Sequence, residues 1–382
     1  MHLSIHPNNW SYWERKSFSR EADLAIIGCG IVGLNAGIRF LENSPKAKVI
    51  ILERGLSPDG ASTKNAGFAC FGSPGELLDD LKNAPPEEVF ALFKRRYDGI
   101  FALRKRLDAE DFGWTPSGGF EIFTEANLQD FPSINQLEEI NREIYKCIGI
   151  HDYFQIADEE ISEHGLINLP HLIKTQHESL LNPVKMIQAL IKKFYSLGGN
   201  IFFGMEVTQW IEDELNVKIL CKNSAQFLAK KLLIAVNGFA KQLIPDIALN
   251  AARNMVICIR PANALLLKGA YHYHHGYVYF RPVEDGVLIG GGRHQDLENE
   301  YTDEIQINQK IYRYLVQFAE QHILGNQKYE IIDQWVGIMG LGPVKKPIIL
   351  MQTPRVGVSV RMGGMGVAIG TLVGNDAAEM LL

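Results

Sequence analysis

The sequence predicts an α/β fold with two parts: a doubly wound sheet, in which helices cover both faces of parallel strands, and a second, mixed sheet. Three observations favour it. Residues 24–27 form an apolar run of strand length that leads directly into the glycine turn at residues 28–33. A second apolar run, residues 49–52, ends at Glu53. Near the end of the chain, a strand pattern at 356–360 is followed by another glycine-rich turn at 361–366 and a helical pattern.

The turn Gly28-Cys29-Gly30-Ile31-Val32-Gly33 has the spacing of a dinucleotide-binding βαβ unit. Gly28 allows a tight turn, Gly30 lets the backbone approach a pyrophosphate, and Gly33 lets helix and strand pack closely. The following helix offers free N–H groups and about +0.5 of a charge to phosphates. Glu53, about 20 residues beyond Gly33, is placed to accept hydrogen bonds from ribose hydroxyls. A tight turn without a ligand is the alternative, which the combined pattern disfavours.

Composition restricts the class of protein. A chain of 382 residues can bury enough apolar surface for two domains, and a net charge of −6 argues against a nucleic-acid-binding surface, which is usually basic. The five cysteines form neither a CxxC pair nor a zinc spacing, so we expect free thiols in a reducing cytoplasm. We find no signal-peptide pattern and no apolar run of membrane-spanning length. Four aromatic residues precede the first strand, and we expect them to pack on the body of the protein: Trp10, Tyr12, Trp13 and Phe18.

Between the two glycine turns the pattern changes from helical to antiparallel. Pro85-Pro86 begins a long amphipathic helix that we expect to end at Gly113, and Asn182-Pro183 begins another that Gly198-Gly199 stops. Strands are expected at residues 118–123, 200–203, 206–210, 217–221 and 231–236, and an antiparallel set at 256–260, 264–268, 276–281 and 287–290, covered by a helix around 307–318. We therefore predict a discontinuous nucleotide-binding domain at 1–84, 177–240 and 331–382, and a second domain at 85–176 and 241–330.

The chain resembles the D-amino-acid oxidase, glycine oxidase and sarcosine oxidase family of FAD-dependent amine oxidoreductases over nearly its whole length. The most specific match is the loop Gly60-Ala61-Ser62-Thr63-Lys64-Asn65-Ala66-Gly67, which runs beside the flavin in that family. The other matching segments are residues 27–33, 52–55, 235–238, 287–291 and 333–337 and the last glycine turn. The resemblance implies a glutathione-reductase-like FAD domain built from separate segments, with a substrate domain between them.

The resemblance also implies the chemistry: a carbon next to an amine nitrogen gives a hydride to flavin N5, and water hydrolyses the imine. Family members with covalent flavin use a cysteine near the C-terminal third or a histidine in the loop after the second strand. No cysteine follows Cys258 and no histidine lies between Glu53 and Lys82, so we expect non-covalent FAD. The residues expected to bind it are Gly28, Gly30, Ile31, Val32, Gly33, Glu53, Arg54, Ala61, Ser62, Thr63, Asn65, Ala66, Gly67, Val207, Ala235, Gly238, Gly363, Gly364, Met365, Gly366 and Val367.

The substrate side is defined by one aromatic residue and one departure from the family. Tyr279 lies where family members place an aromatic residue above the flavin, although a tyrosine of the sheet core would give the same pattern. Met339 stands where amino-acid oxidases carry an arginine for the substrate carboxylate. An anionic substrate therefore needs another cation, and we expect Arg361, with Lys345 and Lys346 as weaker candidates. The alternatives for Arg361 are a contact with FAD and a surface ion pair.

Three neighbouring histidines, His272, His274 and His275, invite a metal-binding interpretation. No acidic residue or cysteine stands at ligand spacing beside them, and alternate residues of a strand face opposite ways. We therefore expect an exposed hairpin at residues 271–276 and no metal site.

We expect an enzyme that acts on a small amine or amino acid derivative, with oxygen or an electron carrier as the acceptor and with no nucleic-acid partner. Leu288 stands where oxygen-reactive sarcosine oxidases carry a lysine, which leaves the acceptor open. Two alternatives remain: a flavin dehydrogenase of a hydroxy acid or polyol with a carrier acceptor, and an FAD-stabilised binding protein without catalysis. A panel of donors with oxygen and dye acceptors separates them, because every donor would leave the binding protein yellow.

Overall fold

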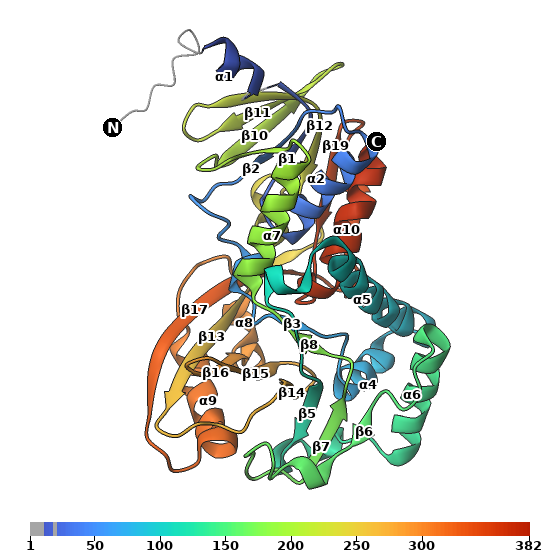
Figure 1. Ribbon diagram of the computed structural model, residues 1–382, viewed down its shortest axis with the longest axis vertical. Helices are drawn as coiled ribbons and strands as arrows, with labels where there is room; N and C mark the ends of the chain where they lie inside the picture. The colour runs from blue at the N-terminus through green and yellow to red at the C-terminus, as the bar shows by residue number, and fades with distance from the viewer. Residues whose placement is uncertain (1–10, 18–20) are drawn as a thin grey trace.

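The computed structural model describes residues 11–17 and 21–382 of the chain. These residues form two eight-stranded sheets, one in the upper and one in the lower half of Figure 1, and a small three-stranded sheet. The predicted α/β architecture with two large sheets is therefore confirmed. None of the described helices is long and apolar enough to cross a membrane.

The first large sheet contains the doubly wound core. Strands β19, β12, β1, β2 and β9 lie side by side in that order and run parallel, while β10, β11 and β18 add antiparallel pairs at the edges. Its strands are β1 (Glu21–Ile27), β2 (Val49–Leu52), β9 (Asn200–Phe202), β10 (Val207–Glu212), β11 (Val217–Cys221), β12 (Gln226–Ile234), β18 (Ile348–Met351) and β19 (Val356–Val360).

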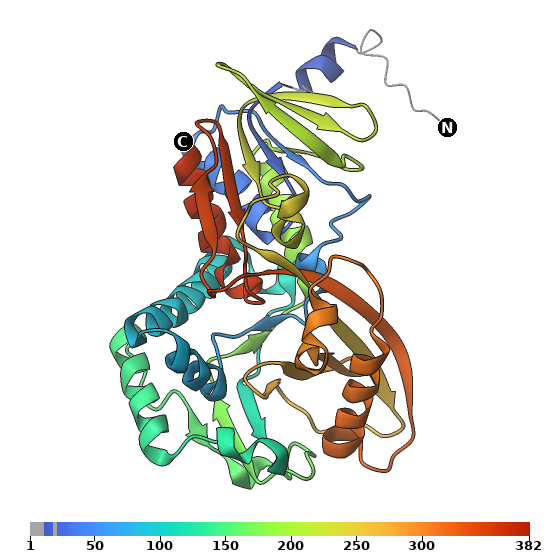
Figure 2. The same cartoon turned by 180° about the vertical axis from the view of Figure 1, so that it is seen from behind.

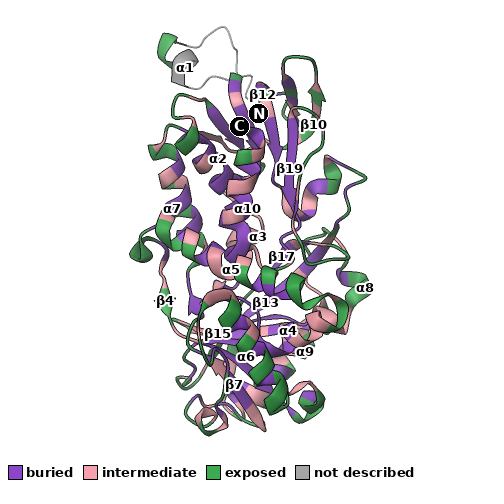
Figure 3. Ribbon diagram, turned by 90° about the vertical axis from the view of Figure 1, so that its right-hand side faces the viewer, coloured by how far each residue is buried: buried purple, intermediate pink, exposed green. Residues whose placement is uncertain are grey.

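Both faces of this sheet are covered, which explains why β1 is apolar without alternation. Leu24 and Ile26 belong to the apolar cluster that also contains residues of helices α2 (Ile31–Asn43), α7 (Pro183–Ser196) and α10 (Gly366–Leu381). Ala25 and Ile27 belong to the cluster on the opposite face, which includes residues of β11. Figure 3 shows that β19 is buried throughout and that most of α10 is buried as well. The first β-strand therefore lies at the centre of the nucleotide-binding half.

The second large sheet is mostly antiparallel, and only β14 and β5 pair in parallel. Its strands are β5 (Gly119–Phe123), β6 (Gln155–Ile156), β7 (His171–Thr175), β13 (Asn250–Pro261), β14 (Ala270–Tyr273), β15 (Val278–Val283), β16 (Gly286–Gly291) and β17 (Tyr329–Leu341). Helix α9 (Gln309–Ala319) covers one face, and Met255 and Ile257 of β13 pack in the same cluster. Val256 points the other way, into a small cluster with Ala66. The alternation on β13 thus directs one face of the sheet toward the loop that follows β2.

Helix α5 (Pro86–Arg106) runs between the two halves, as Figure 2 shows from behind. It packs closely on α10, since a Cβ on Gly99 would lie 2.0 Å from the carbonyl oxygen of Ala368. The small sheet consists of β3 (Phe68–Ala69), β8 (Ser179–Leu180) and β4 (Thr115–Pro116). The other helices are α1 (Tyr12–Ser17), α3 (Ala61–Lys64), α4 (Pro74–Asn83), α6 (Ile134–Ile148) and α8 (Leu297–Glu300), with short 3₁₀ turns that include η2 (Ala109–Phe112), η3 (Glu125–Asp130), η5 (Asn237–Gln242) and η6 (Arg293–Gln295).

Several expected elements differ in the structure. Residues 264–268 form no strand, and the long helix ends at Arg106, after which the separate turn η2 reaches Gly113. Residues 331–341, expected in the nucleotide-binding domain, lie in β17, which pairs with β13 of the second sheet. The side chains of Tyr12 and Trp13 are 58% and 75% exposed, so their expected packing on the body is wrong. Trp10 and Phe18 lie outside the described residues.

Candidate active site

The first glycine turn forms an open helix N-terminus. Gly28 has a φ of +106°, a backbone conformation that favours glycine, and a Cβ on Gly33 would lie 2.1 Å from the carbonyl oxygen of Gly28. Gly30 precedes α2 and offers no side chain to cap it, while the amide of Ile31 donates to Ser62 Oγ at 3.0 Å. The first turn of α2 therefore presents backbone N–H groups on the cavity side, where a phosphate binds favourably.

Glu53 is buried at the end of β2 and faces this turn. Its Oε2 accepts from the amide of Cys29 and its Oε1 from the amide of Gly55, both at 3.0 Å. Each carboxylate oxygen has a second lone pair, so Glu53 can still accept hydrogen bonds from ribose hydroxyls. Beside it, the guanidinium of Arg54 lies over the ring of Phe239, 3.8 Å from the centroid. The arrangement fits the nucleoside end of a dinucleotide.

The loop after β2 owes its shape to the Asn65 side chain. Its Nδ2 donates to the carbonyl oxygens of Ala61 and Ser62 at 3.2 and 2.8 Å, and its Oδ1 accepts from the amide of Gly67 at 2.9 Å. These bonds satisfy backbone groups that would otherwise have no hydrogen-bond partner where the short helix α3 ends. Asn65 thus holds Ser62 next to the N-terminus of α2.

Arg281 of β15 clamps the same loop from the second sheet. Its Nη1 lies 2.9–3.2 Å from the carbonyl oxygens of Ala66, Gly67 and Leu181. Burial lowers the pKa of its guanidinium to about 10, so the group stays charged at neutral pH. Because a charged donor strengthens hydrogen bonds, Arg281 fixes the loop firmly to the second half of the molecule.

The second glycine turn closes the opposite side of the site. Gly363 and Gly364 both have positive φ values, +59° and +83°, and so does Arg361, at +68°. The Asn237 side chain holds this turn, because its Oδ1 accepts from the amides of Arg361 and Met362 at 3.1 and 3.2 Å. Helix α10 begins directly after the turn and has its N-terminus at the site.

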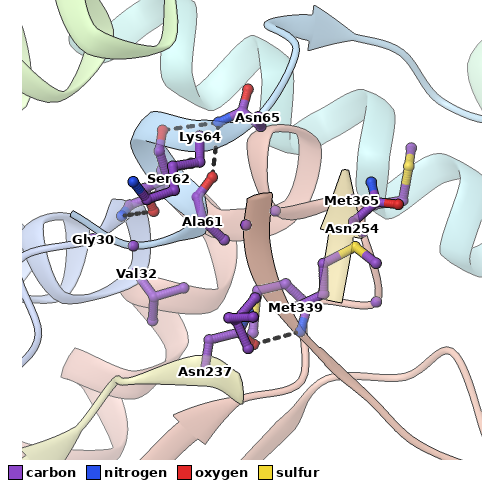
Figure 4. A pocket seen from close by; sticks show the side chains of 18 of the residues that line it. Gly30, Val32, Ala61, Ser62, Lys64, Asn65, Asn237, Asn254, Met339 and Met365 are labelled. Carbon is purple, nitrogen blue, oxygen red and sulfur yellow. Dashed lines mark hydrogen bonds between the residues drawn. The ribbon is translucent and has the colours of Figure 1, made fainter. Parts of the chain in front are cut away.

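One cavity of about 520 Å³ joins the two glycine turns. In Figure 4, Ala61, Ser62 and Asn65 lie on one side of it, and Asn254, Met339 and Met365 on the other. Its lining includes Gly30 and Glu53 at one end and residues of the second sheet at the other. A bare-glycine helix N-terminus, a buried carboxylate and a second helix N-terminus in one cavity fit a dinucleotide that carries negative charge at two places.

The end of the cavity beside the second sheet is aromatic and polar. The ring of Tyr279 packs edge to face on the ring of Phe68, and Asn254 Nδ2 donates to the Tyr279 Oη at 2.8 Å. Burial raises the pKa of the Tyr279 hydroxyl well above its usual value, so the hydroxyl stays protonated and can donate to a ligand. Met339 and His272 also line this end. The geometry gives a ligand one hydroxyl donor beside aromatic and thioether side chains.

The charged groups of this wall are paired with one another. Glu76 binds Arg96 at 3.1 Å and Lys345 at 3.0 Å, and although burial alone would raise its pKa, these cations lower it to about 2. His272 Nε2 lies 3.0 Å from Glu178 Oε2. Burial alone would lower the pKa of His272, but the Glu178 carboxylate outweighs burial and raises it. Glu76, Lys345 and His272 of this wall therefore each have an oppositely charged partner.

Glu121, buried behind the same wall, should make stability depend on pH. The amide of Gly75 donates to its Oε2 at 2.7 Å, yet burial raises the pKa of the carboxyl from 4.5 to about 7. Between pH 4.5 and about 7, the folded state keeps a proton on Glu121 that the unfolded state has lost. The stabilisation from this proton is therefore complete below the unfolded-state pKa, and it is lost as the pH rises through the folded-state pKa. We expect the free energy of unfolding of the wild type to fall by about 2–4 kcal/mol more than that of Glu121→Gln across this window.

Urea unfolding of both proteins, on either side of the window, checks this expectation. The glutamine keeps an acceptor for the Gly75 amide but does not titrate, so it isolates the carboxyl from His272 and Glu76, which titrate in both proteins. Equal pH slopes for the two proteins would contradict it.

The structure brings most of the predicted cofactor residues to the cavity and leaves a few behind it. Those that line it are Gly28, Gly30, Ile31, Val32, Glu53, Arg54, Ala61, Ser62, Asn65, Ala66, Val207, Ala235, Gly363, Gly364, Met365, Gly366 and Val367, and Tyr279 lines it as well. Gly33, Thr63, Gly67 and Gly238 are absent from the lining. They support it from behind: Gly238, for example, lies so close under Met339 that a Cβ would be 2.6 Å from the Met339 carbonyl oxygen.

Arg361 and Lys346 do not reach the cavity. Arg361 Nε donates to the carbonyl oxygen of Lys346 at 2.8 Å, and its Nη1 donates to that of Ala248 at 2.9 Å. The side chain thus points away from the cavity and ties the second glycine turn to neighbouring chain segments. The expectation that Arg361 binds a substrate carboxylate is therefore wrong. Lys346 contributes only the backbone carbonyl oxygen that accepts from Arg361. Its neighbour Lys345 does line the cavity.

The three histidines lie in a β-hairpin, as expected, since β14 pairs antiparallel with β15, but the hairpin is not exposed. His272 is only 8% exposed and pairs with Glu178, and both His274 and His275 lie near Asp130, with 3.6 and 3.3 Å between the ring nitrogens and its Oδ2. The acidic partners are remote in the sequence, which is why spacing along the chain does not reveal them. Sequence reasoning also missed Phe68, Asn254 and Glu76 as lining residues, because none of them stands in a recognisable motif.

Comparisons with known proteins agree with this geometry. The model of a family described as FAD dependent oxidoreductase matches residues 23–380. The protein named "Probable oxidoreductase OrdL" of Rhizobium meliloti (strain 1021) is 23% identical over 387 residues, which cover 95% of this chain and 84% of that protein.

Two solved structures share the architecture. Glycine oxidase from Geobacillus kaustophilus has a TM-score of 0.73 at 18% sequence identity, with 94% of each chain covered. L-proline dehydrogenase from P. horikoshii has a TM-score of 0.73 at 16% identity, with 94% of this chain and 93% of that chain covered. At these identities the likeness shows the fold alone.

Proposed function

Because this chain belongs to the family of FAD-dependent oxidoreductases, we propose that it oxidises a C–N bond of an amine or amino acid derivative. When bound, FAD supplies the acceptor, its N5 atom, for the hydride that leaves the carbon next to the nitrogen, and water then hydrolyses the imine product. The similar proteins whose names state a substrate, glycine oxidase and L-proline dehydrogenase, act on amino acids. Their names support an amine substrate here.

The observation that carries the proposal is the single cavity that joins the nucleotide turn to the second sheet. The N-terminus of α2 and Glu53 would hold pyrophosphate and ribose. The N-terminus of α10, at Gly366, would stabilise negative charge on the reduced cofactor through its N–H groups and dipole. These contacts would bind and polarise the cofactor without a side chain that must gain or lose a proton.

Tyr279 and Asn254 would position the substrate at the other end. Asn254 donates to the Tyr279 oxygen, which leaves the tyrosine O–H free to donate to the substrate. The chain needs no side-chain base if the amine binds in its neutral form, since the reacting carbon then loses only a hydride. Positioning in a largely apolar cavity is therefore the main contribution of these residues.

Product analysis tests the proposal against a hydroxy-acid or polyol dehydrogenase. The holoprotein is supplied with matched pairs of amino and hydroxy compounds, with oxygen and with a dye as acceptor. We expect release of ammonia or of the N-alkyl amine together with a carbonyl compound from the amino member of a pair. Carbonyl product from the hydroxy members alone would favour the dehydrogenase, and a protein that stays yellow with every donor would favour a binding role.

We also propose that the FAD is held without a covalent bond. All five cysteines are free in the structure. Two of them line the cavity: Cys29, within the first glycine turn, and Cys70. Burial raises the pKa of the Cys70 thiol well above its usual value, which keeps it from acting as a thiolate nucleophile. Acid precipitation should therefore release all the flavin into the supernatant. Yellow colour in the pellet would contradict this expectation.

A further inference from the structure

We propose that Asp130, His274 and His275 form a binding site for a divalent transition metal ion with the ligand preferences of Zn²⁺. The proposal goes beyond the oxidation of an amine and does not depend on turnover. It rests on the separations of the three ligand atoms, on the hydrogen bond that orients the His275 ring, and on a carboxylate oxygen without a partner. The sequence did not predict this site, because Asp130 lies far from the two histidines along the chain.

The three residues meet where the turn η3 lies against the hairpin of β14 and β15. Asp130 is the last residue of η3, and His274 and His275 follow directly after β14. Both histidines have positive φ values, +51° and +55°, a conformation that the surrounding structure must hold in place. Thr124 Oγ1, at the start of η3, lies 3.2 Å from Tyr273 Oη, the residue before His274. The two segments are therefore held together before any ion binds.

The ligand atoms have separations close to those of a tetrahedral metal site. His274 Nδ1 and His275 Nε2 lie 3.6 and 3.3 Å from Asp130 Oδ2, and one ligand atom of each residue lies within 4.8 Å of those of the other two. Zinc bonds of about 2.0–2.1 Å at tetrahedral angles place neighbouring ligand atoms about 3.3–3.4 Å apart. The His274 side chain is 32% exposed, so its ring can rotate slightly to fit an ion. Water can take the fourth position.

The orientation of the His275 ring leaves a nitrogen lone pair facing Asp130. Its Nδ1 lies 3.0 Å from the carbonyl oxygen of Gly75, which can only accept, so Nδ1 carries a hydrogen and donates it. In the neutral ring, Nε2 is then an acceptor, and it faces another acceptor, Asp130 Oδ2. Two acceptors at 3.3 Å repel each other unless a cation lies between them. Histidines that bind metals in proteins commonly donate their other ring N–H to a backbone carbonyl, as His275 does.

The Asp130 carboxylate supports the same assignment. Its Oδ2 is shielded from solvent and has no hydrogen-bond partner within the described chain. A shielded carboxylate oxygen is costly unless a cation or a donor compensates it. The groups beside this oxygen are the two imidazoles, the other ligands of the proposed site, and the partly exposed His274 ring gives an ion access to it.

A second group of ligating side chains, Cys70, Glu178 and His272, is buried in the cavity wall. There, His272 Nε2 and Glu178 Oε2 already form a hydrogen bond of 3.0 Å, so neither atom needs an ion. The set at Asp130 differs, because its carboxylate oxygen has no such bond. Two imidazoles and one carboxylate suit Zn²⁺ and other first-row transition metals, whereas Mg²⁺ and Ca²⁺ prefer oxygen ligands.

An ion at this site would stabilise the wall of the cavity. His275 lines the cavity and Asp130 is absent from its lining, so the ion would lie at the edge of the wall. Through the Gly75 carbonyl, the His275 ring also contacts the first turn of α4, which carries the lining residue Glu76. The ion would therefore hold η3, the hairpin and α4 in fixed positions relative to one another.

Zinc binding to the holoprotein tests the proposal without an amine donor, so the result is independent of the proposed function. The holoprotein is treated with a chelator, dialysed and titrated with Zn²⁺ in a calorimeter, with and without excess Mg²⁺. We expect the affinity of the site to fall by about 100-fold or more in Asp130→Asn and in His275→Asn, because each loses a ligand, and Mg²⁺ should not compete. Asparagine tolerates the left-handed backbone at position 275. Circular dichroism and flavin content verify that the variants are folded.

His171→Asn is the matched control. Its ring also pairs with an aspartate, since His171 Nδ1 lies 2.8 Å from Asp158 Oδ2, but it lies outside the proposed site. This variant should bind zinc as the wild type does. Zinc should also raise the thermal midpoint of the wild type and of His171→Asn, and not that of Asp130→Asn, because only an ion bound to the folded state stabilises it.

Three results would overturn the proposal. A wild type that binds no zinc would do so, whatever the variants show. Equal zinc affinity and stoichiometry in the wild type and Asp130→Asn would leave an ion pair between Asp130 and a protonated His275 as the explanation of the geometry. Zinc that is lost from Glu178→Gln and kept by Asp130→Asn would assign the ion to the group at Cys70 instead.

Discussion

Gly30→Val should yield a folded but colourless protein. The backbone at Gly30 is extended, with φ −89° and ψ −176°, which valine adopts without strain, so the fold should survive. A Cβ there would lie 2.9 Å from Ser62 Oγ, and the two methyl groups beyond it would occupy the space in front of the α2 N-terminus. Since a pyrophosphate loses at least two charge-assisted hydrogen bonds, we expect FAD affinity to fall by about 100-fold or more.

Flavin content after purification and FAD titration of the apoprotein measure this effect. Gly30→Ala is the graded comparison: its single methyl contacts only the movable Ser62 side chain, so it should retain an intermediate affinity. Circular dichroism verifies that both variants are folded. A Gly30→Val protein with full flavin content would show that the cofactor is bound elsewhere.

Arg253→Met should lower the free energy of unfolding by about 3–5 kcal/mol, because it leaves a buried carboxylate without its cation. Arg253 of β13 and Glu300 of α8 are 7% and 0% exposed, and Arg253 Nη2 lies 2.6 Å from Glu300 Oε1. Arg253 Nε adds two contacts of 3.2 Å to the same carboxylate, and Asn308 donates to it at 2.8 Å. The pair fastens the turn after β16 to the sheet beneath it.

Urea unfolding of the holoprotein measures the loss, with two comparisons. Arg260→Met is the matched control on the same strand: Arg260 is half exposed and its ion pairs are 3.6 Å long, so its removal should cost less than about 1 kcal/mol. The double variant Arg253→Met/Glu300→Leu should recover most of the stability, because it removes the unpaired charge. A double variant no more stable than Arg253→Met would argue against an electrostatic cause.

The nucleotide half could be predicted because its signals are local. The strand, the three glycines and Glu53 fall within about 30 residues, the length of a βαβ unit, and each glycine answers a steric demand within that unit. The second glycine turn was found for the same reason. The sequence of this turn could not show that the Asn237 side chain accepts a hydrogen bond from its backbone, because Asn237 lies 124 residues before Arg361.

The second half resisted prediction where partners are remote in the sequence. The spacing of His272, His274 and His275 did not indicate that His272 is buried, because its partner Glu178 lies 94 residues away in the sequence. Residues 333–337 match a segment of the family, and residues 331–382 were expected in the nucleotide-binding domain. The backbone of residues 331–341 instead pairs with β13 and extends the other sheet. Arg361 was placed correctly beside the turn, but its neighbours in the sequence gave no sign that its side chain turns toward Ala248.

The most direct test of the central claim, an FAD enzyme that oxidises an amine in the cavity between the two sheets, is bleaching of the bound flavin without oxygen. The holoprotein is mixed anaerobically with an amino acid, with its N-methyl derivative and with the hydroxy acid of the same carbon skeleton, and the flavin absorbance is followed. The account predicts rapid bleaching by an amino or N-methylamino compound and no bleaching by the hydroxy acid. Bleaching by the hydroxy acid alone, or by none of the donors, would contradict it.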